Sequence, residues 1–151
     1  GACEYGLDMK TVATRVLKWS YGIKVSKVWK DGDPLSRKDS NGRIDKFFLM
    51  ARKGTEVDAE KEFSNNFSPI RPDQTSITSK FFYTNEYGAE YCDEPHMRKL
   101  GSFRTSGLPT KSSGLNRSVC ETLRFASMES TIVTAKSLHN GETYNTIFST
   151  E

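Results

Sequence analysis

The chain has 151 residues, of which 35% are hydrophobic and 27% charged, and its formal net charge is +3 at pH 7. That length suits one domain, which buries roughly 70% of its unfolded surface without disulfides or metals. The charge is too small to predict a nucleic-acid partner, and no apolar run approaches the roughly 20 residues that span a bilayer. Three widely spaced cysteines and a start without signal-peptide features lead us to expect a soluble, cytoplasmic protein.

The first residues differ in pattern from everything that follows. Tyr5, Leu7, Met9 and Val12 lie among good helix formers, and Gly6 is typical of a helix end. From residue 14 onward the pattern alternates between apolar and polar residues, as strands do. We therefore expect the end of a helix and a linker at residues 1–13, and a β domain at residues 14–151.

The first half of the β domain predicts several strands separated by polar turns. We expect strands at residues 16–17, 21–29 and 44–50, with an exposed loop of turn formers at residues 31–42 between the last two. Residues 57–63 predict a strand whose outer face carries Glu56, Asp58, Glu60 and Glu62. A turn at residues 69–73 leads into a strand at residues 76–84, which ends in an aromatic cluster.

Residues 100–151 predict a β-meander of one strand near Leu100 followed by three alternating strands. Leu123, Phe125 and Ser127 share one face of the second strand. Asn140-Gly141 favours a type I′ hairpin turn, whereas the link at residues 128–130 lacks glycine and needs a longer or type I turn. Roughly eight short strands predict an all-β sandwich or barrel.

No set of residues supports catalysis. Cys92, Asp93, Glu94 and His96 form the one cluster of possible metal ligands, but a single Cys-x-x-x-His without a second pair favours a structural loop over a zinc site. The histidines lie in polar loops, so no Ser-His-Asp or Cys-His arrangement is expected. We expect no enzyme activity, no metal and no cofactor of this chain's own.

A locally basic segment at residues 24–53 is the other notable feature. Its nine cations outnumber its four acids, and they are Lys24, Lys27, Lys30, Arg37, Lys38, Arg43, Lys46, Arg52 and Lys53. A solvated surface explains such a segment more simply than an anion-binding patch, because most charged runs only solvate a surface. Salt-dependent binding to a polyanion would favour the patch.

Several short segments, in a shared order, resemble the substrate-binding domain of the seventy-kilodalton heat-shock chaperones. They are Trp19-Ser20-Tyr21-Gly22-Ile23, Glu62-Phe63-Ser64, Leu100-Gly101-Ser102-Phe103, Gly107-Leu108-Pro109, Leu123-Arg124-Phe125 and Ile132-Val133-Thr134-Ala135. Arg71-Pro72-Asp73-Gln74 and Met97-Arg98-Lys99-Leu100-Gly101 look most like the divergent "member 12" branch. The resemblance implies an antiparallel β-sandwich of about eight strands after a short N-terminal helix, the close of a nucleotide-binding domain.

This resemblance implies a peptide-binding module that holds extended, apolar-centred segments by β-augmentation. Ile23 and Val25 would line the cleft, Phe63 would form the pocket wall, and Ile77, Ser79 or Phe81 would face it, with a register uncertain by one residue. Core packing is an equal alternative for Ile23, Val25 and Phe63. ATP would act only through a nucleotide-binding domain that this chain does not contain.

The chain departs from the family where an arch closes over the peptide. Ser26 stands in place of an apolar residue, and Asn66 occupies the opposite arch position. A polar arch would hold an apolar peptide weakly, so a narrower peptide preference is expected. The alternative is a non-catalytic interaction domain that uses the basic surface of residues 24–53 for a protein or polyanionic partner.

Overall fold

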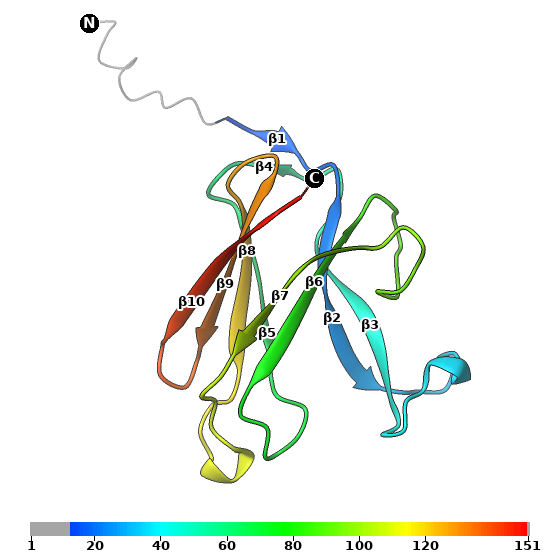
Figure 1. Cartoon of the computed structure of the whole chain (residues 1–151), viewed down its shortest axis with the longest axis vertical. Helices are drawn as coiled ribbons and strands as arrows, with labels where there is room; N and C mark the ends of the chain where they lie inside the picture. Colours follow the sequence, from blue (N-terminus) through cyan, green and yellow to red (C-terminus); the bar gives the residue numbers. More distant parts are fainter. Residues whose placement is uncertain (1–12, 151) are drawn as a thin grey trace, which may run out of the picture.

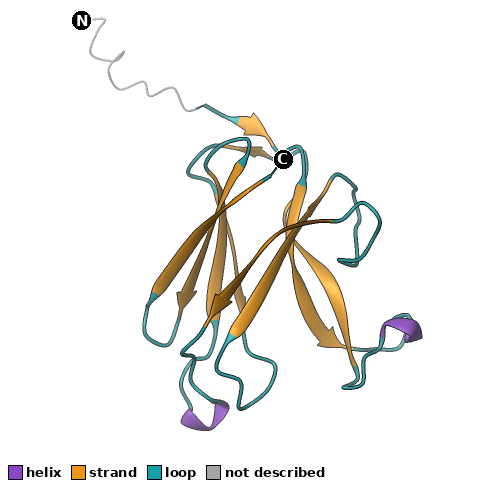
Figure 2. Ribbon diagram, viewed as in Figure 1, coloured by secondary structure: helices purple, strands orange, loops and turns teal. Residues whose placement is uncertain are grey.

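The structure is a computed structural model that describes residues 13–150, and almost all of its regular structure is strand (Figures 1 and 2). The strands are β1 (Arg15–Val16), β2 (Ser20–Val28), β3 (Arg43–Ala51), β4 (Glu56–Val57), β5 (Glu62–Phe67), β6 (Ile77–Thr84), β7 (Arg98–Thr105), β8 (Val119–Phe125), β9 (Ser130–Ser137) and β10 (Thr143–Ser149). Two single-turn 3-10 helices, η1 (Leu35–Arg37) and η2 (Lys111–Ser113), lie in loops. The expected all-β class is confirmed.

The strands form three sheets, and every pairing is antiparallel. One four-stranded sheet has the order β10-β9-β8-β5, the other has the order β3-β2-β6-β7, and β1 pairs with β4. The two larger sheets run side by side in Figure 1, with the short β1–β4 pair at one end. Among the described residues no helix is long and apolar enough to cross a membrane.

A single main core joins the two larger sheets. The alternation along β8 points Leu123 and Phe125 inward, and Phe125 packs against Tyr21 of β2 with ring centroids 4.6 Å apart. Phe81 of β6 and Val133 of β9 are both 0% exposed in the same cluster. Inward-facing aromatic and branched side chains from both sheets therefore supply the apolar burial that stabilises the fold.

The edge strands of the two larger sheets approach each other on two opposite sides of the molecule. On one side β7 lies against β10, where the ring of Phe148 covers Gly101. On the other side β3 lies near β5, where Phe48 meets Phe67 edge-on with ring centroids 5.8 Å apart. The β3–β5 side contains the pocket described below.

Two expectations about strand arrangement are wrong. The strand expected at residues 57–63 is divided into β4 and β5, because the Asp58 side chain accepts a hydrogen bond from the Glu60 amide at 2.8 Å and turns the chain. The two pieces join different sheets, so the four carboxylates do not share one strand face. The strand at Leu100 is β7, which pairs with β6, so only β8, β9 and β10 form the meander.

The hairpin linking β9 to β10 also differs from expectation. A type I′ turn needs a positive φ at both central residues, but only Gly141 has one, at 75°, and Asn140 does not. The Gly141 amide donates to the Ser137 carbonyl at 2.8 Å, which closes a longer loop. The link before Ser130 contains no residue with positive φ, as its lack of glycine predicts. The helix end expected at residues 1–13 falls outside the described residues, except for Ala13, which is in no helix.

Candidate functional site

A pocket of about 530 Å³ lies between the two larger sheets on their β3–β5 side. Pockets of this size are typical of ligand sites. Its walls come from β2, β3, β5, β6 and β8 and from the loop between β5 and β6. Its lining includes Ile23, Val25, Phe48, Phe67, Ile77 and Glu121.

Most of the site residues expected from the sequence lie together in this pocket. Six of the eight line it, namely Ile23, Val25, Ser26, Asn66, Ile77 and Ser79. Ile23, at 2% exposed, also belongs to the main core cluster, and Val25 packs against that cluster. The other two expected residues lie in the core away from the pocket. Phe81 is 0% exposed, and Phe63 is half-buried against Phe125 with ring centroids 5.8 Å apart.

Apolar side chains from several strands form one part of the pocket wall. Ile23 and Phe48 are direct partners in the β2–β3 pairing, and Ile77 stands on the neighbouring strand β6. Phe67 reaches the same wall from the opposite sheet. These groups offer an apolar channel that suits the stem of an inserted side chain.

The two expected arch residues, Ser26 and Asn66, both line the pocket but do not bond to each other across it. Ser26 is held by Arg43, whose Nε donates to the Ser26 Oγ at 2.8 Å and whose Nη2 donates to the Ser26 carbonyl at 2.9 Å. Among the described residues, no hydrogen bond links the side chains of Ser26 and Asn66. The pocket therefore has no polar bridge across it at these two positions.

Strand β5 presents a free backbone edge beside the pocket. Among the described residues its only ladder partner is β8. The Leu138 amide donates to the Ser118 carbonyl, so the even-numbered residues of β8 bond to β9 and the odd-numbered ones to β5. In this phase Asn66 directs its N–H and C=O away from β8. The Asn66 amide is instead occupied by the Asn65 Oδ1 at 2.8 Å. A side chain therefore covers one donor of the edge without pairing the strand.

Glu121 was not expected as a site residue. It lines the pocket from β8, is 0% exposed, and neither of its carboxyl oxygens has a hydrogen-bond partner among the described residues. Burial raises the pKa of Glu121 to about 7, and the nearby Ser79 hydroxyl offsets part of that rise. The alternation that places Leu123 and Phe125 inward extends to Glu121, so the sequence contained a signal for it.

The Ser79 hydroxyl faces this carboxyl from the opposite sheet. It is also buried and lacks a hydrogen-bond partner within residues 13–150. On β5, Asn65 is the direct cross-strand partner of Glu121. This part of the pocket therefore carries a carboxyl and a hydroxyl that face each other without the geometry of a hydrogen bond.

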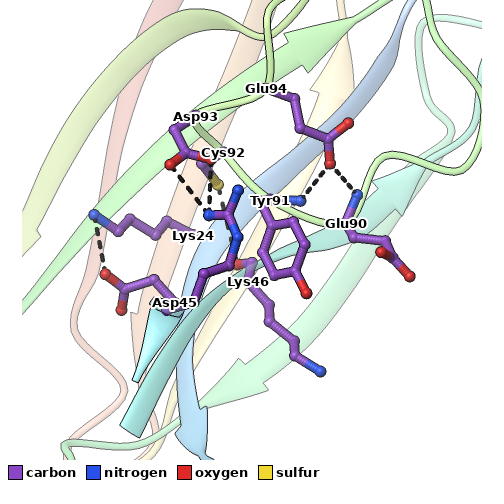
Figure 3. Close-up of polar contacts among 9 residues, drawn as sticks. Lys24, Asp45, Lys46, Glu90, Tyr91, Cys92, Asp93 and Glu94 are labelled. Carbon is purple, nitrogen blue, oxygen red and sulfur yellow. Dashed lines mark hydrogen bonds and ion pairs between the residues drawn. The ribbon is translucent and has the colours of Figure 1, made fainter. Parts of the chain in front are cut away.

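The basic segment at residues 24–53 is largely occupied by contacts within the chain. Figure 3 shows Lys24 reaching Asp45, with the nitrogen and oxygen 3.3 Å apart. Arg37 pairs with Asp93 at 2.9 Å and its guanidinium lies 3.7 Å from the centre of the Tyr91 ring. Other cations of this segment with such partners are Lys38, Arg43, Lys46 and Lys53. Three of the nine cations, Lys24, Arg37 and Lys46, are thus paired with carboxylates, which leaves less positive charge free for a polyanion.

The side chains of the Cys92 cluster each have a different partner. Glu94 accepts hydrogen bonds from the Glu90 and Tyr91 amides at 2.7 and 2.8 Å, as Figure 3 shows. His96 lies 3.7 Å from a Glu86 oxygen. Burial raises the pKa of the Cys92 thiol to about 11, so it is protonated at neutral pH. Within the described residues, no group of three or more potential metal ligands converges.

No protein-family model matches the chain, and no curated protein matches it. The resemblance to the heat-shock chaperones therefore stays a prediction from the sequence.

Proposed function

We propose that this chain is a β-sandwich module that binds extended peptide segments and has no catalytic role of its own. One observation carries the proposal. Six residues expected at a peptide site, from strands far apart in the sequence, line one pocket beside a free strand edge.

The pocket and the edge supply two complementary parts of peptide recognition. An extended segment laid along β5 would pair with the outward backbone groups of Asn66, and one of its side chains would enter the channel between Phe48 and Phe67. Main-chain hydrogen bonds give affinity that tolerates many sequences, and the pocket selects one side chain. To pair fully, the segment has to displace the Asn65 side chain from the Asn66 amide.

The resemblance to the chaperone domain supports the same proposal. Under it, ATP control would come from a nucleotide-binding domain elsewhere, and the reducing cytoplasm would be the place of action. Free thiols at Cys92 and Cys120 suit that compartment. The alternative partner surface at residues 24–53 has less support, because three of its nine cations are paired with carboxylates within the chain.

Fluorescence anisotropy with labelled heptapeptides tests the proposal. We expect binding to the wild type and a loss of about tenfold or more in Asn65→Trp, since Asn65 shares the pocket face of β5 with Phe67 and a bulky ring there would obstruct the pocket. Asn145→Trp is the matched control, because Asn145 is also exposed on an edge strand of the same sheet but at its far side. It should bind like the wild type.

Backbone pairing is tested separately with the same peptides carrying N-methyl groups at alternate amides. Removing these donors should weaken binding strongly if the segment adds to the β5 edge. Absence of binding by every peptide, or equal losses in Asn65→Trp and Asn145→Trp, would contradict the proposed function.

A further inference from the structure

The geometry points to a pocket that selects a primary alkylammonium group, presented as a lysine side chain of the bound segment and paired with Glu121. This inference rests on the proposed function, since it names the side chain that the peptide site prefers. It differs from the apolar-centred preference expected from the sequence.

The carboxyl group of Glu121 is the first observation. A fully buried carboxyl without a partner is unfavourable, and a cation or a hydrogen-bond donor that reaches it recovers much of the lost solvation. Glu121 is 0% exposed, and both of its oxygens are unpaired among the described residues. The Ser79 hydroxyl, unpaired and buried nearby, offers a second acceptor to the same ligand group.

The shape and chemistry of the walls are the second observation. Phe48 and Phe67 form an aromatic side to the channel, and Ile77 adds an aliphatic one. An apolar channel that ends at a carboxyl matches a side chain built of an apolar stem and a terminal cation. Lysine has that form, and its compact ammonium requires less width than a guanidinium.

The remaining charges of the pocket do not cancel this preference. The other charged residues in the lining are Lys24, Lys27, Asp45 and Lys80. Lys24 is paired with Asp45 at 3.3 Å, and Lys27 and Lys80 are exposed, where solvent screens them. Lys80 also alternates with Ser79 along β6, so its side chain leaves the sheet on the opposite face.

Access to Glu121 requires a small local movement. The carboxyl lines the pocket, yet water does not reach its oxygens, so an entering ammonium has to displace neighbouring side chains. Asn65, opposite Glu121 on β5, is exposed, and its side-chain oxygen accepts a hydrogen bond from the adjacent Asn66 amide. The same displacement that frees the β5 edge for a peptide would open this end of the pocket.

Binding of the cation should depend on pH in a defined direction. The ammonium pairs with ionised Glu121, whose pKa in the free protein is about 7 because of burial. Affinity for a lysine-centred peptide should therefore rise between about pH 6 and 8 and then level off, while the lysine itself stays protonated. A leucine-centred peptide should show no such rise.

The experiment compares heptapeptides with identical flanks and a central lysine, Nε-acetyl-lysine or leucine. At pH 8 we expect the lysine peptide to bind about tenfold tighter than the acetylated one, as a charge-assisted hydrogen bond allows. Glu121→Gln should abolish this difference. The exposed Glu60→Gln should retain it, and circular dichroism checks that both variants are folded.

A second measurement does not need a peptide. In protein labelled with ¹³C at glutamate side-chain carboxyls, n-butylamine should shift the Glu121 resonance and lower its titration midpoint. Equal binding of the three peptides with no butylamine effect would overturn the lysine preference and leave the proposed function standing. A butylamine effect without any peptide binding would support an ammonium-binding pocket at Glu121, but it would overturn the proposal that a peptide supplies the ammonium. Failure of both measurements would overturn both proposals.

Discussion

At the scale of single residues, Glu121 makes the stability of the fold depend on pH, because its carboxyl is buried. Its place in the alternation of β8 sends a carboxyl into the interior between Val119 and Leu123, both 0% exposed. The alternation in the sequence thus determines that the Glu121 side chain points inward. Whether it meets a hydrogen-bond or ion-pair partner there depends on the neighbouring strands. In this fold Asn65 and Ala135 are its cross-strand partners, Ser79 faces it from the other sheet, and none of the three carries a charge.

The stability of the protein should fall as pH rises from about 4.5 to about 7. The folded protein holds the Glu121 proton up to a pKa of about 7, whereas the unfolded chain releases it near the ordinary value of 4.5. The folded state therefore binds more protons in this interval, and the free energy of unfolding decreases by about 3 kcal/mol before levelling off. Urea denaturation between pH 4.5 and 8 measures this decrease.

Glu121→Gln is the informative variant for this prediction. It removes the titration but keeps the size of the side chain, so its stability should vary less with pH and exceed that of the wild type at pH 8. Glu60→Gln, at an exposed position, should follow the wild-type curve. Parallel curves for wild type and Glu121→Gln would rule out the raised pKa.

At the scale of elements, two glycines allow close approach of strands. A Cβ on Gly22 of β2 would lie 2.6 Å from the Phe47 Cζ and would also clash with the Phe48 carbonyl oxygen on the adjacent strand. A Cβ on Gly101 of β7 would meet the ring of Phe148, with the Cζ at 2.8 Å. The obstacle at Gly22 includes backbone of β3, which cannot shift without moving the strand. The obstacle at Gly101 is a side chain on the edge strand β10.

We expect Gly22→Ala to destabilise the protein more than Gly101→Ala. Overpacking costs about 1–3 kcal/mol, and the backbone clash should put Gly22→Ala at or above the upper end. Rotation of Phe148 should relieve much of the strain in Gly101→Ala. Thermal unfolding of the two variants side by side tests the order, and a larger loss for Gly101→Ala would contradict it.

The elements themselves were partly predictable. Alternation correctly placed the strands at residues 20–28, 43–51 and 77–84 within a few residues of their ends. It failed at residues 57–63, because alternating residues can continue through a turn when Asp58 supplies the turn hydrogen bond. Period two indicates which way a side chain faces if a strand exists, but it does not show where the strand must bend.

At the scale of the whole molecule, the shared core makes the two larger sheets dependent on each other. Leu123 of β8 is 0% exposed and lies in the cluster that also contains Tyr21 and Phe81 of the opposite sheet. Loss of packing on one sheet therefore removes contacts from the other. Cooperative unfolding is expected of such an arrangement.

Leu123→Ala should lower the free energy of unfolding by about 2–5 kcal/mol while keeping one transition. Leu115→Ala is the matched control, since Leu115 is 54% exposed in a loop, and it should change stability little. Circular dichroism and tryptophan fluorescence should report the same midpoint in each variant. Two separate transitions would show that the sheets unfold independently.

The sequence by itself determined the all-β class, most strands, and the faces on which Ile23, Leu123 and Phe125 lie. These features depend on neighbours two residues apart, so they are visible in the chain as written. Only the tertiary structure decided that Phe48, Phe67 and Glu121 border one pocket and that Phe63 packs in the core. Those residues lie on strands whose pairing depends on closing long loops and burying a common core, which no local pattern specifies.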